Sequence, residues 1–153
     1  MRLLKGLAVG TATALLLAAC GGDGDELSEE EFLTQANEIC RVGEGEIEES
    51  FNEFFPNGEP TQAEVEEFLA DNATEYRDAI VSNLRSQIDG IRDLDGPSAI
   101  EDDLDPLLDE GSVVIDGIAA GSPEEFFLTE NEGLVEVITQ LGELGLTSCG
   151  EGE

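Results

Sequence analysis

Four motifs of one form occur along the chain, and they constrain its fold more strongly than any other feature. In each motif a serine or threonine stands three residues before a glutamate: Ser28 with Glu31, Thr61 with Glu64, Ser98 with Glu101, and Ser122 with Glu125. In such a capping box, the hydroxyl and the carboxylate bind backbone N–H groups that the first turn of a helix leaves without partners. Three of the motifs follow turns that contain proline or glycine. They therefore predict four helix starts.

Apolar residues after the first two motifs recur at spacings of three and four, which is typical of helices with one buried face. The first helix is expected to begin after Ser28, and its apolar stripe would let it continue past Gly43 and Gly45 to Phe55. The second helix is expected to be the longest, over residues 62–94.

The third helix is expected over residues 99–119, where Pro106 would either kink it or split it, because proline removes a backbone donor and clashes with the preceding turn. The last helix follows a loop near residues 129–132. It is expected to end at a left-handed Gly145, with Leu146 folding back onto it. Its apolar stripe comprises Leu134, Val137, Ile138, Leu141 and Leu144.

Four helices with short connections, or five if the third is split, predict an all-α fold. We expect an antiparallel bundle of four, possibly five, helices over residues 28–150. A flexible acidic tether over residues 20–27 would precede this domain, and a disordered tail over residues 151–153 would follow it.

The N-terminal segment has the pattern of a bacterial export signal. Arg2 and Lys5 precede the mostly small or apolar residues 6–19, a stretch too short to span a bilayer but suited to a secretory signal. Its end, Leu17-Ala18-Ala19-Cys20, resembles the lipobox of bacterial lipoproteins. The resemblance implies that residues 1–19 are removed and that Cys20 carries lipid such as palmitate. The protein would then be anchored in the cell membrane, facing the extracytoplasmic side.

Cysteine count predicts a disulfide. If Cys20 carries lipid, Cys40 and Cys149 remain as an even pair in an oxidising compartment. The chain has no histidine and no Cys-x-x-Cys spacing, so a reactive thiol or a metal ligand has little support. A bridge between Cys40 and Cys149 would close a long loop, which stabilises a fold by about 4–5 kcal/mol in the chain-entropy description.

Charge limits the partners of the chain. All 37 acidic residues follow Cys20, against four arginines, which gives a net charge of −33 beyond that residue. Such a surface repels nucleic acid and anionic lipid headgroups, so membrane attachment would depend on the lipid at Cys20. The acidity is either a solvated surface suited to saline surroundings or a binding surface for cations or a basic ligand. Asp89 is placed to pair with Arg85 and Arg92 on one helix surface.

The residues that enzymes most often use are missing. Without histidine, and without lysine beyond Cys20, the chain lacks Ser–His, Cys–His and Schiff-base chemistry. We therefore predict a protein that is not an enzyme and needs no cofactor. Two functions remain. One is a non-catalytic interaction or envelope module that recognises a cell-envelope protein; the other is a protein that binds cations or a basic ligand.

Two acidic stretches partly match a calcium-binding loop, and residues 24–32 fail because ligands are missing where the loop needs them. Asp93, Asp95 and Asp102 follow part of the spacing of an EF-hand loop. The first ligand position would fall on Ile91, however, and Pro97 interrupts the loop. We therefore expect no ordered metal site there, and at most weak binding of divalent cations by the acidic surface.

Three further motifs carry a family resemblance: Phe32-x-x-x-Ala36-Asn37-x-Ile39-Cys40, Gln87-Ile88-Asp89-x-Ile91-Arg92-x-Leu94-x-x-Pro97, and Gly145-Leu146-x-x-Cys149-Gly150. Over residues 32–150, the chain resembles a family of small secreted or lipid-anchored helical proteins of actinobacteria. The resemblance implies an extracytoplasmic location, a helical fold and a disulfide, and the family has no assigned activity to carry over. This chain departs from the family pattern in having Leu144 where an aromatic residue is usual.

The lipobox interpretation predicts the behaviour of one variant. Cys20→Ala should abolish incorporation of a labelled fatty acid and leave the precursor uncleaved, because the cysteine thiol is the acceptor of the lipid. Metabolic labelling and mass spectrometry of the membrane fraction measure both effects, with Cys149→Ala as the control that keeps its label. Normal maturation of Cys20→Ala would contradict the interpretation.

Overall fold

The computed structural model describes residues 26–149 apart from 57, 59, 129 and 130. Every regular element in this part of the chain is a helix. The elements are α1 (Glu29–Phe54), α2 (Gln62–Asp71), α3 (Ala73–Arg92), α4 (Ser98–Ala120), α5 (Pro123–Leu128), α6 (Glu132–Glu143) and the 3-10 helix η1 (Thr147–Cys149). The proposed signal, Cys20, most of the tether and the tail lie outside the described residues.

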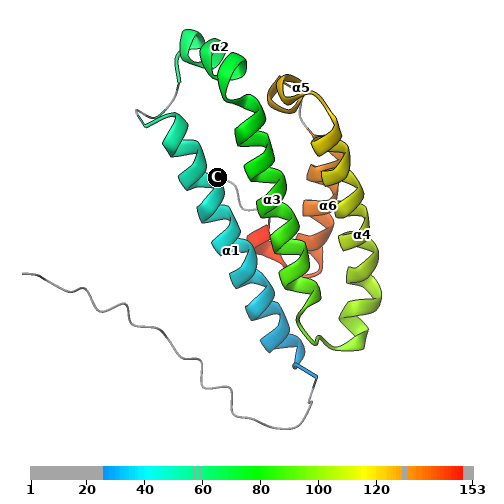
Figure 1. Cartoon of the computed structure of the whole chain (residues 1–153). Helices are drawn as coiled ribbons and strands as arrows, with labels where there is room; N and C mark the ends of the chain where they lie inside the picture. Colours follow the sequence, from blue (N-terminus) through cyan, green and yellow to red (C-terminus); the bar gives the residue numbers. More distant parts are fainter. Residues whose placement is uncertain (1–25, 57, 59, 129–130, 150–153) are drawn as a thin grey trace, which may run out of the picture.

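The long helices form an antiparallel bundle (Figure 1). Helix α1 packs on α3, α3 on α4, and α4 on α6, while η1 lies against both α1 and α6 and closes the bundle. The short helices α2 and α5 lie at the same end of it. The predicted all-α antiparallel fold is confirmed, with six α-helices in the described residues instead of four or five. In this part of the chain, no helix has the length and apolar character that crossing a bilayer requires.

The core consists of three groups of buried apolar side chains. The group nearest the start of α1 contains the largest fully buried side chains, which are those of Phe32, Cys40, Leu108 and Leu146. A second group, centred on Val81, Ile115 and Ile118, joins α3 to α4. The third group is aromatic and lies under α2 and α5. Burial of each large side chain stabilises the fold by roughly 1.5–3 kcal/mol, so all three groups hold the bundle together.

Two of the predicted capping boxes are present. The Ser28 hydroxyl accepts a hydrogen bond from the Glu31 N–H, and the Glu31 carboxylate accepts one from the Ser28 N–H. Thr61 and Glu64 form the same pair of bonds at the start of α2. The hydroxyl hydrogen bonds of Ser28 and Thr61, followed by the backbone bonds, lower the pKa of Glu31 and of Glu64. Local sequence therefore starts α1 and α2 where the motifs predicted.

The prediction of a capping box at Ser98 is wrong. Pro97 takes the N-cap position in an extended conformation, so Ser98 is already the first helical residue. The Ser98 N–H instead donates to the Glu26 carboxylate at 2.7 Å, and the Leu27 N–H donates to the Asp95 carbonyl at 2.8 Å. Glu26, in the segment before α1, thus binds an N–H group at the start of α4 that a local cap would otherwise bind. Ser122 directly precedes α5, as the fourth motif predicts.

The expected single helix over residues 62–94 is interrupted. It divides at Asn72, whose φ of −124° and ψ of −11° end α2 and begin α3. The bend lets α2 turn across the end of the bundle (Figure 1). There Phe68 becomes buried against Phe55 and Tyr76. Packing of Phe68, which is a tertiary effect, therefore overrides the local helical pattern.

Helix α4 is not split at Pro106, which lies inside one continuous helix.

The expected pairing of Arg85 and Arg92 with Asp89 is wrong. Both guanidinium groups reach α4, where Arg85 binds Asp116 and Arg92 binds Asp109. Exposed ion pairs of this kind contribute about 0.2–1 kcal/mol each.

Pro106→Ala should raise the free energy of unfolding by about 1–3 kcal/mol. Alanine restores a backbone donor inside α4, although it also makes the unfolded chain more flexible, which offsets part of the gain. Urea unfolding followed by circular dichroism measures the change. An unchanged or lower stability would contradict the cost assigned to Pro106 inside α4.

Candidate functional site

The predicted disulfide is confirmed. Cys40 on α1 is bonded to Cys149 in η1, across 109 residues of sequence, with a Cα–Cα distance of 4.7 Å. Cys40 is buried in the core group that also contains Leu146, which is 0% exposed. The bond therefore joins the end of the described chain to the first helix of the bundle.

Asn37 reinforces this joint one turn before Cys40. Its amide nitrogen donates to the carbonyls of Leu33 and Gly145 at 2.8 and 2.9 Å, and its amide oxygen accepts from the Ser148 N–H at 2.8 Å. Gly145 has the predicted left-handed conformation, with a φ of +96°. The Leu146 N–H donates to the Leu141 carbonyl, which confirms the predicted helix end. Asn37 and the disulfide thus have a structural role.

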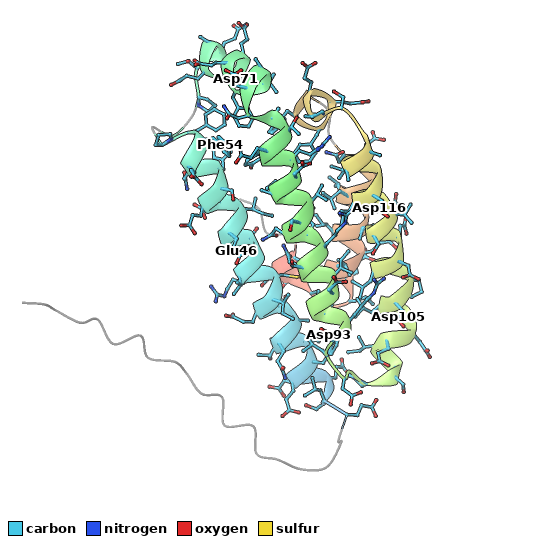
Figure 2. All side chains as sticks on the ribbon, viewed as in Figure 1. Glu46, Phe54, Asp71, Asp93, Asp105 and Asp116 are labelled. Atoms are coloured by element: carbon cyan, nitrogen blue, oxygen red, sulfur yellow. A yellow bond between two sulfur atoms is a disulfide. The ribbon has the colours of Figure 1, made fainter. Side chains whose placement is uncertain are left out.

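The three candidate calcium ligands all lie in exposed positions. Asp93 follows the end of α3, Asp95 lies in the loop to α4, and Asp102 is in the first turns of α4. Figure 2 shows Asp93 at the end of the bundle opposite α2. In the described residues, no group of three or more His, Cys, Asp or Glu side chains is arranged to hold a metal ion, and these three form none.

An aromatic cluster occupies the opposite end of the bundle. It contains every aromatic side chain of the chain except Phe32, namely Phe51, Phe54, Phe55, Phe68, Tyr76, Phe126 and Phe127. The ring centroids of contacting pairs lie 4.9–5.8 Å apart, in tilted or edge-on arrangements that aromatic pairs favour. Burial raises the pKa of Tyr76. These rings pack mainly against one another and hold α1, α2, α3 and α5 together.

A surface groove lies between α1 and α3. We call it the α1–α3 groove. It consists of two adjoining hollows of about 360 and 310 Å³ that share Glu46, Asn83 and Ser86. Its floor and sides include Ile39, Gly43, Ile47, Asn83, Ser86 and Gly90, and neither hollow is lined by α4 or α6. The groove therefore lies on a side of the helix pair that the rest of the bundle leaves open.

Two glycines explain how α1 and α3 come close enough to form this groove. A Cβ atom on Gly43 would lie 2.3 Å from the Nε2 atom of Gln87, and one on Gly90 would lie 3.4 Å from Ile39. The side chain of Gln87, on α3, therefore lies directly over Gly43 of α1. At the rim of the groove, Val42 is 47% exposed.

A chain of hydrogen bonds crosses the groove. The Gln87 amide donates to the Asn83 side-chain oxygen at 2.6 Å, and the Asn83 amide donates to the Glu46 carboxylate at 2.8 Å. Glu46 is thereby held at the α1 side of the groove, where Figure 2 labels it. The two amides and the carboxylate provide polar groups beside the apolar side chains of Ile39, Val42 and Ile47.

The charge at the groove is negative. Glu38 and Glu46 of α1 both line it, and neither hollow is lined by a lysine or arginine. Arg41, one turn from Glu38, donates hydrogen bonds to the Glu38 carboxylate and lowers its pKa. Glu38 is therefore charged at neutral pH. The arrangement suits attraction of a positively charged group.

Sequence reasoning missed this groove. The signal was present in Gly43 and Gly90, together with the small residues Ser82 and Ser86, but it has meaning only once α1 and α3 are known to be neighbours.

Comparison of the chain with protein-family models, curated proteins and solved structures finds no match. The resemblance to the actinobacterial family stays a prediction.

Reduction of the Cys40–Cys149 bond should lower the melting temperature clearly, because the bond closes a loop of 109 residues and is worth about 4–5 kcal/mol in the chain-entropy description. Calorimetry with and without a reducing agent measures the shift. The control is the double variant Cys40→Ser, Cys149→Ser, whose melting temperature should not respond to the reductant. Equal melting temperatures for oxidised and reduced protein would contradict the role assigned to the bond.

Proposed function

We propose that this protein is a lipid-anchored, non-catalytic interaction module on the extracytoplasmic side of the cell membrane, which binds another envelope component through the α1–α3 groove. The observation that carries this proposal is a groove whose hollow beside Ile39 and the exposed Val42 is mostly apolar, on a surface that is otherwise strongly charged. Exposed apolar recesses with a few placed polar groups are characteristic of binding sites.

Two further observations support the location. A structural disulfide is typical of proteins outside the cytosol, and Cys40 and Cys149 form one. The lipobox-like Cys20 would place the start of α1 close to the membrane. Because α1 has 26 residues, it would carry the bundle about 39 Å outward. The groove, which lies along this helix, would then be open to partners on the extracytoplasmic side of the membrane.

Binding of cations by the acidic surface is the second candidate. It is favoured by the excess of carboxylates, since the four arginines beyond Cys20 each pair with one aspartate or glutamate and the chain has 37 acidic residues. A melting temperature that rises to saturation at micromolar calcium would support this candidate. A gradual rise that sodium reproduces would reflect screening of the surface charges.

The interaction module is tested by site-specific photocrosslinking on intact cells. A photoreactive amino acid at position 42, on the rim of the groove, should give a discrete adduct with an envelope component. The matched control is the same amino acid at position 113, because Val113 is also an exposed valine but lies on α4. Absence of an adduct from position 42, or the same adducts from both positions, would contradict binding through the groove.

A further inference from the structure

We infer that the occupant of the α1–α3 groove is a helix of a partner protein, with an apolar face flanked by lysine or arginine. This inference rests on the proposed function, because it names the class of partner for the same surface. It follows from the shape of the groove, from its charge and from the groups that line it.

The shape of the groove fits a helix. The groove follows residues 38–50 of α1 and 79–90 of α3, a length of about 18 Å or three helical turns. The valley between two packed helices accepts a third helix, and small side chains allow the closest approach of the helix axes. Ser86 supplies such a side chain at the exposed surface of the groove, whereas Gln87 already covers Gly43 and Ile39 contacts Gly90. Every regular element in the described residues is helical, so the described part offers no sheet edge with which an extended peptide could pair.

The apolar part of the groove requires an apolar face on the partner. Val42 is 47% exposed, and Ile39 and Ile47 are only partly buried by the chain itself. A helix lying over these residues would remove their side chains from water. Each Å² of apolar surface covered contributes roughly 25 cal/mol, before the costs of association.

The charge of the groove requires basic flanks on that face. Glu38 and Glu46 lie on the same helix, eight residues apart, which places them about 12 Å or two turns from each other. A partner helix with basic residues about two turns apart would bring one to Glu46 and one to Glu38, whose carboxylate it would share with Arg41. The Asn83 amide already orients Glu46, and a carboxylate can accept further hydrogen bonds from a lysine or arginine.

The same charge argues against a second copy of this chain as the occupant. Each copy has a net charge of −31 over the full sequence, and a copy placed in the groove would bring carboxylates against Glu38 and Glu46. Like charges across an interface oppose association. Nucleic acid and anionic lipid headgroups are disfavoured for the same reason.

The inference is tested by titrating the oxidised, full-length protein with a synthetic helical peptide. The peptide has about 18 residues, long enough to form a helix on binding, with leucine and alanine on one face and two lysines about two turns apart beside it. The protein is held in nanodiscs of zwitterionic lipid, and a titration of empty nanodiscs is subtracted. Binding is followed by fluorescence anisotropy at physiological salt.

We expect Ser86→Phe to weaken binding by about tenfold or more, because the ring would fill the groove from an exposed position. The control is Val113→Phe, which places the same ring on exposed α4 and should leave binding unchanged. We expect the double variant Glu38→Gln, Glu46→Gln to weaken binding by about fivefold. Its matched control, Glu110→Gln with Glu136→Gln, removes the same charge from exposed positions on α4 and α6 and should have little effect.

Circular dichroism and melting temperature establish that each variant is folded. Equal losses in the two glutamine double variants would overturn the inference, because the peptide would then be attracted by overall charge. No binding to the unmodified protein would overturn the assignment of a basic helix as the occupant. Both results would leave the proposed function standing, since the photocrosslinking at position 42 detects a partner of any chemistry.

Discussion

Cys40 and Cys149 join the first helix of the bundle to the end of the described chain, and the other features of the structure depend on this joint. Asn37 supports it by binding Gly145 and Ser148, and Leu146 fills the core beside it. Helix α6 packs mainly on α4 and η1, so η1 is its main link to α1. The excess of negative charge opposes any compact state of this chain. A disulfide lowers the conformational entropy of the unfolded chain, and this stabilisation of the fold offsets the repulsion.

This closure also determines which surface remains open. Helix α4 packs on α3, α6 packs on α4, and η1 connects α6 to α1, whereas the α1–α3 groove is lined only by α1 and α3. The aromatic cluster fixes α1 and α3 at one end, and the core around Phe32 and Cys40 fixes them at the other. The groove between these two fixed ends would therefore be preformed, which lowers the entropic cost of binding.

Much of the fold could be predicted from the sequence because its determinants are local. Capping boxes at Ser28 and Thr61 and the left-handed Gly145 mark helix ends through hydrogen bonds within a few residues. The disulfide followed from counting cysteines. The break at Asn72 could not be predicted, because it depends on Phe68 meeting rings from α1, α3 and α5. Ser98 failed as a cap because Pro97 takes the N-cap position, and Glu26 from another segment binds the Ser98 N–H instead. The groove needed the pairing of Gly43 with Gln87, which only the packed structure reveals. The lipid anchor at Cys20 lies outside the described residues and stays a prediction.

Native-state hydrogen exchange, measured by NMR on the oxidised protein at low salt, tests the closure most directly. We predict that the amides of Cys40, Leu141 and Leu146 exchange only through global unfolding, with one common free energy, because the joint makes α1, α6 and η1 a single cooperative unit. Rapid exchange of the α6 and η1 amides by local opening, while α1 and α3 remain protected, would contradict this account.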